Sequence, residues 1–149
     1  MVTVKTPMTV ASVTAAVTIA LADFAHADTE YHFQSPSGNI ACWLGDVIFN
    51  GGVECDIAQY TYALPARPAD CPTQIVNFGD RFTLIPGQAA VMSCHGDTVR
   101  VPGEMQTLNY GQKLSLGQIS CDSEQSGMIC TDTSTGHYFL VSRDSYELR

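Results

Sequence analysis

Positive charge is scarce in this sequence, which has seven Lys and Arg residues against fifteen Asp and Glu and a formal net charge of −8 at pH 7. A surface of this sign repels the phosphates of nucleic acids and the anionic headgroups of lipids. We therefore expect no nucleic acid partner. Because the acidic residues are scattered along the chain, we interpret them as the surface of a soluble globular protein.

The sequence also lacks the local patterns that identify common active sites and metal sites. It has no G-x-S-x-G or S-x-x-K motif for a serine nucleophile, no C-x-x-C motif and no Asp-x-Asp-x-Asp-Gly calcium loop. Because these patterns are absent, we predict no catalytic residue, no metal and no cofactor. An active site dispersed along the chain is the alternative, for example Ser93, His137 and Asp132, because catalytic triads are defined by geometry and not by their order in sequence.

Charge is also missing from residues 8–22 (MTVASVTAAVTIALA), which have the length of a signal-peptide core and are too short to span a bilayer comfortably. Lys5 provides a positive start, and Ala25-His26-Ala27 has the small-x-small pattern that signal peptidase reads. We predict a cleavable signal peptide over residues 1–27, with cleavage after Ala22 as the alternative. The protein is then secreted, to the extracellular space or the cell envelope, without a membrane span after cleavage.

The segment that remains, residues 28–149, has an even set of six cysteines: Cys42, Cys55, Cys71, Cys94, Cys121 and Cys130. In an exported protein such a set predicts three disulfides, and 15 pairings are open to it. Turn signals favour two pairs: Gly127 lies between Cys121 and Cys130, and Asn50-Gly51-Gly52 lies between Cys42 and Cys55. Cys71 and Cys94 are the two cysteines that remain, so we pair them by elimination.

Helix signals are few in residues 28–149, whereas short strands separated by Gly or Pro are frequent. The candidate strands are residues 39–43, 53–57, 81–85, 89–94, 98–101, 113–116, 118–121, 128–132 and 138–142. Turn signals lie between most of them, including Ser35-Pro36-Ser37-Gly38, Asn77-Phe78-Gly79-Asp80, His95-Gly96-Asp97 and Asn109-Tyr110-Gly111. We predict a single all-β domain, a small disulfide-stapled sandwich or barrel of short hairpins with little or no helix.

Residues 60–72 are different, because they contain three prolines and no alternation of polar and apolar residues. They predict an extended surface loop fixed at Cys71. Tyr60 and Tyr62 share one face if this segment is extended, and they are the candidate binding residues. The only tryptophan, Trp43, is adjacent to Cys42, and we expect it to pack in the core against the disulfide.

Several segments taken together resemble a family of small secreted actinobacterial proteins, including mycobacterial ones, that is grouped only as a domain of unknown function. These segments are residues 33–42 (FQSPSGNIAC), 53–55 (VEC), 94–98 (CHGDT), 108–111 (LNYG), 136–143 (GHYFLVSR), the pair Cys121 and Cys130, and Tyr146. The resemblance covers nearly all of residues 28–149. It implies an exported domain with disulfides, and it supplies no catalytic residue.

Ser37-Gly38 and Ser126-Gly127 are also similar to the loop that periplasmic lysozyme inhibitors insert into an enzyme cleft, although the tyrosine that follows Ser-Gly in those inhibitors is absent here. Three hypotheses about function follow. The first is a non-enzymatic binding module for an extracellular or cell-envelope protein or polysaccharide. The others are a small extracellular hydrolase with a dispersed Ser/His/Asp site, and an inhibitor of a cell-wall hydrolase such as lysozyme.

Overall fold

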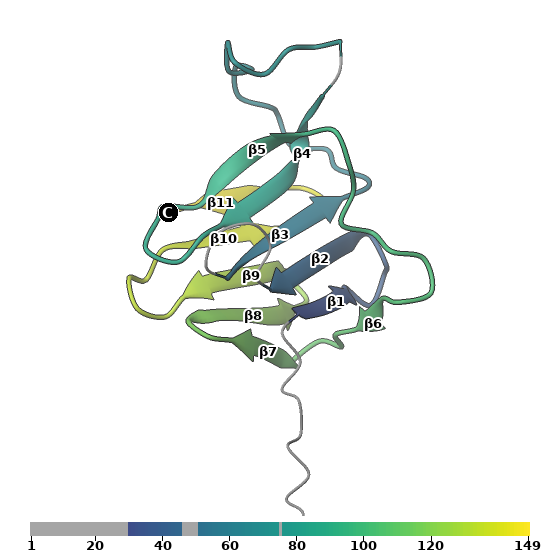
Figure 1. Ribbon diagram of the computed structural model, residues 1–149. Coiled ribbons are helices and arrows are strands. Elements are labelled where there is room, and N and C mark those ends of the chain that lie inside the picture. The colour runs from purple at the N-terminus through teal and green to yellow at the C-terminus, as the bar shows by residue number, and fades with distance from the viewer. Residues whose placement is uncertain (1–29, 46–50, 75) are drawn as a thin grey trace, which may run out of the picture.

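The computed structural model describes residues 30–45, 51–74 and 76–149. The expected signal peptide over residues 1–27 and Asn50 of the expected hairpin turn lie outside these residues. The described chain contains eleven strands and no helix (Figure 1). The predicted all-β, disulfide-stapled sandwich is therefore confirmed.

The strands form two sheets that pack face to face (Figure 1). The first has the order β5-β4-β3-β2-β1-β6, and the second has the order β11-β10-β9-β8-β7. All neighbours are antiparallel except β1 and β6. The strands are β1 (Glu30–Gln34), β2 (Ile40–Gly45), β3 (Gly52–Ile57), β4 (Asn77–Leu84), β5 (Val91–His95), β6 (Gln106–Thr107), β7 (Lys113–Leu116), β8 (Ile119–Glu124), β9 (Gly127–Asp132), β10 (Tyr138–Val141) and β11 (Tyr146–Leu148).

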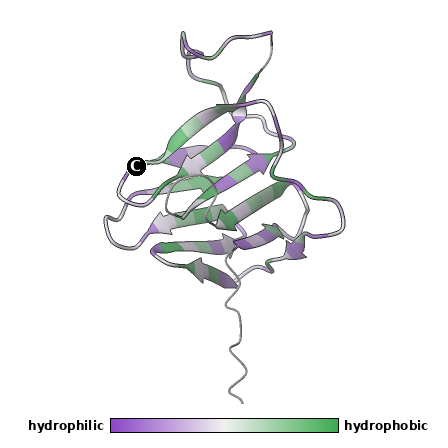
Figure 2. Cartoon of the chain, viewed as in Figure 1, coloured by the Kyte–Doolittle hydropathy of each residue, from purple (hydrophilic) through white to green (hydrophobic). Residues whose placement is uncertain are grey.

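Apolar and polar residues alternate along most strands, so each sheet has one apolar face that packs against the other sheet (Figure 2). Across the middle of each sheet, residues that are paired in register form a row of apolar side chains that includes two cysteines. In the first sheet the paired residues are Phe33, Cys42, Cys55, Phe82 and Met92, and in the second they are Leu114, Cys121, Cys130, Phe139 and Leu148. The rings of Phe82 and Phe139 meet across the sandwich, with centroids 5.9 Å apart.

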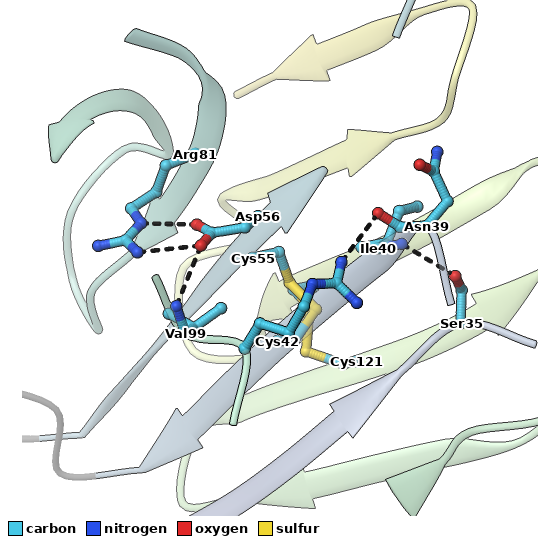
Figure 3. The surroundings of a disulfide bond; sticks show 11 residues. Ser35, Asn39, Ile40, Cys42, Cys55, Asp56, Arg81, Val99 and Cys121 are labelled. Atoms are coloured by element: carbon cyan, nitrogen blue, oxygen red, sulfur yellow. Dashed lines mark hydrogen bonds and ion pairs between the residues drawn. A yellow bond between two sulfur atoms is a disulfide. The ribbon is translucent and has the colours of Figure 1, made fainter. Parts of the chain in front are cut away.

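Two disulfides lie in these central rows and link residues that are direct partners in the ladder. Cys42–Cys55 joins β2 to β3 and Cys121–Cys130 joins β8 to β9, each with a Cα–Cα distance of 4.1 Å. All four residues are fully buried in the core, where Cys121 lies beside the Cys42–Cys55 bond (Figure 3). The third disulfide, Cys71–Cys94, ties the loop between β3 and β4 to β5. These are the three pairs that the turn signals and elimination favour.

Two expected elements are wrong, and each has its own physical cause. Residues 98–101 form no strand, since the Thr98 hydroxyl and the Val99 N–H both donate to the Asp56 carboxylate. The expected turn at residues 77–80 is the first half of β4, where a bulge shifts the register against β5. The sequence patterns predicted no strand at β1, β6 or β11. Strands β6 and β11 are at the edges of their sheets, and β1 is next to the edge strand β6.

The hairpin between β8 and β9 requires glycine at its last position. Gly127 has a φ of 142°, and a Cβ at this position would collide with the carbonyl of Val141. We therefore expect Gly127→Ala to lower the free energy of unfolding by about 2 kcal/mol or more. Gly117 is the matched control, because it also has a positive φ (57°) but has no neighbour within 4 Å of a Cβ. Urea unfolding of Gly117→Ala should show a loss of about 1–2 kcal/mol from its backbone conformation alone, smaller than that of Gly127→Ala. An equal loss in both variants would contradict the hairpin geometry.

Candidate functional site

Both Ser-Gly turns emerge at the same end of the sandwich. Gly38 precedes Cys42 of β2 by four residues, and Gly127 precedes Cys130 of β9 by three residues. Because both cysteines lie in the central layer of their sheets, the two turns lie at a similar height above it. They border a pocket of about 500 Å³, which we call the end groove.

The end groove is lined mainly by turns and strand ends, and most of its lining side chains are polar. The lining residues are Ser35, Ser37, Gly38, Asn39, Ile40, Ala58, Gln59, Tyr110, Ser123, Glu124, Gln125, Gly127, Ser142 and Arg143. They come from both sheets and from the segment between β6 and β7. A ligand in the groove would therefore contact both halves of the sandwich.

The wall formed by the β1–β2 turn is held by a network of hydrogen bonds. The Asn39 side chain donates to the carbonyl of Gln59 and accepts from the Gln59 N–H, both at 2.9 Å. From the other side, the Arg100 guanidinium donates to the Gly38 carbonyl at 2.8 Å. Ser35 accepts the N–H of Ile40 within the turn (Figure 3). The wall is thus fixed before any ligand binds, which lowers the entropy cost of binding.

The opposite wall presents Tyr110, which is 50% exposed. The tyrosine is in a tight turn, closed by a bond from the Gln112 N–H to the Asn109 carbonyl, with Gly111 at a φ of 82°. This turn is bonded to β8, because Gly111 donates to the Ser123 carbonyl at 2.7 Å and Ser123 donates back to Gln112 at 3.0 Å. These bonds fix the backbone that carries Tyr110, and its side chain is half exposed to solvent.

Four further side chains at the groove have unused hydrogen-bonding groups. Among the residues the structure describes, the side chains of Gln59, Glu124, Gln125 and Arg143 make no hydrogen bond or ion pair. All four residues are exposed. The backbone of Arg143 is nevertheless fixed, since its carbonyl accepts the Thr61 N–H at 2.8 Å. These groups are available to a ligand.

The predicted tyrosine pair is arranged as expected but is not an exposed patch. The rings of Tyr60 and Tyr62 stack with centroids 4.5 Å apart. Tyr62 is buried in the core against Phe82, and its hydroxyl donates to the Gly79 carbonyl at 2.8 Å. Burial raises the pKa of Tyr62 above its ordinary value. Only Tyr60 keeps a part that faces solvent, so a binding role for this pair stays a prediction that rests on Tyr60.

The expected core position of Trp43 is wrong. Trp43 lies on the outer face of β2, half-buried, and stacks on His32 of β1 with centroids 5.6 Å apart. Its indole N–H donates to Glu30 at 3.2 Å. The adjacent Cys42 points inward, and neighbouring residues of a strand point to opposite faces, so adjacency to the cysteine itself places Trp43 outside.

The structure does not unite the side chains of the dispersed catalytic triad. His137 and Asp132 are linked through the backbone, where the His137 carbonyl accepts the Asp132 N–H at 2.8 Å. Ser93 donates to the Thr83 hydroxyl at 2.7 Å on the outer face of the first sheet. Asp132 is buried within the second sheet and accepts the Gly87 N–H and both the N–H and the hydroxyl of Ser134. His95 likewise has both ring nitrogens engaged, with Asp80 at 2.9 Å and the Asp97 carbonyl at 2.6 Å. None of these hydrogen bonds links a hydroxyl to a histidine.

Asp132 instead ties the second sheet to the β4–β5 turn, and it makes stability depend on pH. The bond from Gly87, followed by those from Ser134, holds the pKa of Asp132 well below its ordinary value of 3.8. A carboxyl whose pKa is lowered by folding contributes stability that is fully present above its ordinary pKa of 3.8 and is lost as pH falls through the folded-state pKa. We expect Asp132→Asn to be less stable than wild type at pH 7 and to approach it at pH 2.

Urea midpoints at pH 7, 4 and 2 measure this effect. Asp122→Asn is the control, because Asp122 forms a half-exposed pair with Lys113 on the same sheet. The difference in urea midpoint between pH 7 and pH 2 should be as large for Asp122→Asn as for wild type. If Asp132→Asn keeps that whole difference as well, Asp132 is not the source of the acid sensitivity.

A cluster of charged residues on the outer face of the first sheet fixes the loop that leads from β5 to β6. Arg81 is 4% exposed and donates to Asp56 at 2.7 and 3.1 Å (Figure 3). It also donates to Asp97 at 2.7 Å. Burial opposes the charged form of Asp56, but the bonds from Arg81, Val99 and Thr98 outweigh it and lower its pKa. Through residues 97–100 this cluster also positions Arg100, which holds the Gly38 wall of the end groove.

Sequence analysis missed Tyr110, Gln59, Gln125 and Arg143 as candidate binding residues. A signal for one of them was present, because an aromatic residue within the Asn109–Gly111 turn has no strand face on which to be buried. In the part of the chain that the structure describes, no three His, Cys, Asp or Glu residues are grouped to hold a metal ion, and no helix could cross a membrane.

Comparison with known proteins gives a family without an assigned activity. Residues 13–148 match the model of a family of unknown function (DUF6636). A search of curated proteins and a search of solved structures each returned no match. Since the matched segment includes all eleven strands, all six cysteines and every residue that lines the end groove, the chain belongs to the DUF6636 family.

Proposed function

We propose that the protein is exported and acts outside the cytosol. Two features support this proposal: the uncharged stretch at residues 8–22, which has the composition of a signal peptide, and the three disulfides, which persist in oxidising compartments. Amino-terminal sequencing of the protein recovered outside the cytosol tests it. A mature chain that begins at Asp28, or at Asp23, agrees with the proposal, and a chain retained in the cytosol with residue 1 attached would overturn it.

We also propose that the exported domain is a non-enzymatic binding module and that the end groove holds its ligand. The observation that carries the proposal is the contrast within the groove between fixed walls and free side chains. Asn39, Arg100 and the Asn109–Gln112 turn hold the walls, whereas Tyr110, Gln59, Gln125, Glu124 and Arg143 present unused binding groups. Binding sites on rigid scaffolds commonly combine these two features.

A variant that fills the groove tests this proposal. Ala58 is exposed and lines the groove, so Ala58→Trp places a large ring in the ligand's space. Ala89→Trp is the matched control, because Ala89 is also exposed but lies on the β4–β5 connection outside the groove. Oxidised wild-type and variant proteins are immobilised and exposed to culture filtrate and solubilised cell envelope.

We expect Ala58→Trp to lose the molecules that wild type and Ala89→Trp both retain. Folding of each variant is checked by its amide NMR spectrum. If Ala58→Trp retains the same molecules in the same amounts as the control, the end groove is not the binding site.

Inhibition of a cell-wall hydrolase is a second candidate function, and it is favoured by the positions of Ser37 and Ser126. Both serines are exposed at the tips of the two turns that border the groove. An inhibitor of this kind would insert one of these tips into an enzyme cleft. Lysozyme activity measured with micromolar oxidised protein tests it: inhibition that Ser37→Arg or Ser126→Arg abolishes would agree, and unchanged lysozyme activity would exclude it for that enzyme.

A further inference from the structure

We propose that the ligand of the end groove is a neutral saccharide whose ring lies against Tyr110. This inference rests on the proposed binding function and adds to it the chemical class of the ligand. Three observations carry it: the placement of one aromatic ring, the polar groups around it, and the charge balance of the groove.

The first observation is that Tyr110 is held in position and remains exposed. The backbone that follows it is bonded to β8, through Gly111 at 2.7 Å and Gln112 at 3.0 Å, yet the ring is 50% exposed. A sugar ring has one face made largely of C–H bonds, and such a face packs on an aromatic ring while the hydroxyls at its edge stay free to hydrogen bond. Because its backbone is already fixed, Tyr110 can provide this platform at low entropic cost.

The second observation is that the free polar groups include both donors and acceptors. Gln59 and Gln125 each offer an amide N–H₂ and a carbonyl, Arg143 offers only donors, and Glu124 offers only acceptors. Every sugar hydroxyl is a donor and an acceptor at once, so a polyhydroxylated ligand can satisfy all four side chains. An apolar ligand would leave them desolvated and unpaired.

The third observation is that the groove does not favour an anion. Arg143 is the one described cation whose side chain has no partner, since the others contact protein groups: Arg67 with Cys71, Arg81 with Asp56, Arg100 with Gly38, Lys113 with Asp122 and Arg149 with Glu147. Glu124 lies in the same groove, and the chain has a net charge of −8. An acidic ligand would gain one attraction and meet the repulsion of the whole surface.

Isothermal titration of the oxidised protein with defined oligosaccharides tests the inference. The probes are tetrasaccharides of glucose, mannose, galactose and N-acetylglucosamine, with the galacturonic acid tetramer as the acidic counterpart of the galactose tetramer. Tyr110→Ala removes the ring, and Tyr110→Phe keeps the ring and removes only the hydroxyl. Val91→Ala is the control, because Val91 is 49% exposed on β5 outside the groove.

We expect at least one neutral tetrasaccharide to bind, with affinity roughly tenfold weaker for Tyr110→Ala and nearly unchanged for Tyr110→Phe and Val91→Ala. The acidic tetramer should bind more weakly than the galactose tetramer. The inference is overturned if no neutral probe binds at millimolar concentration, if Tyr110→Ala binds as well as wild type, or if the acidic tetramer binds better. If no sugar binds but Ala58→Trp still loses its captured molecules, the saccharide inference fails alone, whereas unchanged capture by Ala58→Trp ends the proposed function too.

Discussion

Reduction of all three disulfides is expected to unfold the protein at neutral pH. The bonds span sequence separations of 13, 23 and 9 residues. In the chain-entropy model, each loop of this size contributes about 3 kcal/mol by restricting the unfolded chain. Their sum of about 9 kcal/mol is comparable to the whole stability of a domain of this size, which is about 5–15 kcal/mol.

Near-ultraviolet circular dichroism during titration with a phosphine reductant measures this loss, because the signal reports the packing of the tyrosines and phenylalanines. Alkylated reduced protein should have no cooperative urea transition. Paired replacements separate the individual bonds without leaving a free thiol. We expect Cys42→Ser with Cys55→Ser, and Cys121→Ser with Cys130→Ser, each to lower the free energy of unfolding by about 3 kcal/mol. A reduced and alkylated chain that keeps the wild-type urea midpoint would show that the sandwich does not depend on its disulfides.

Arg81→Met is expected to lower the free energy of unfolding strongly. The Arg81 side chain is 5% exposed and lies between Asp56, Asp97 and Glu54, with shortest nitrogen–oxygen distances of 2.7, 2.7 and 3.5 Å. Removal of the arginine leaves a buried Asp56 carboxylate without its partner, and such a change typically costs about 3–5 kcal/mol. It also removes the bonds that hold Asp97 to the sheet, whereas Thr98 and Val99 keep their bonds to Asp56.

Lys113→Met is the matched control, because it removes a cation from an exposed pair with Asp122 at 3.2 Å. Exposed pairs contribute about 1 kcal/mol or less, and salt weakens them. Urea unfolding at low and high salt should therefore show a large, nearly salt-independent loss for Arg81→Met and a small loss for Lys113→Met. Equal losses in the two variants would mean that the charged cluster on the outer face contributes no more stability than an exposed ion pair.

The features that sequence analysis predicted well are those set by local turn chemistry. Cys121 and Cys130 lie on either side of a short turn that Gly127 ends, so a hairpin necessarily makes them neighbours. The strand at Lys113–Leu116 is bounded by Gly111 and Gly117, and its predicted limits match the structure. The loop at residues 60–72 followed from its prolines, since proline removes the N–H that a ladder needs.

The features that sequence analysis missed depend on contacts between residues far apart in the chain. Residues 98–101 read as a strand because they are β-branched, but Asp56, more than forty residues earlier, takes two of their donors. Adjacency to Cys42 suggested a core position for Trp43, but adjacent residues of a strand point to opposite faces. Tyr62 lies in an irregular loop, and its burial comes from Phe82 and Tyr146, which are far from it in the sequence. The end groove was not predictable, because it forms only where turns of two different sheets meet.

Mass spectrometry of peptides from the unreduced protein tests the architecture. Two of the disulfides join residues that are direct partners in the β-ladders, so the observed pairs report the strand register on which the end groove and both central rows depend. We expect three linked peptide pairs, Cys42 with Cys55, Cys71 with Cys94 and Cys121 with Cys130, and no free thiol. A bond between the two sheets, such as Cys42 with Cys121, or six unpaired thiols, would contradict it.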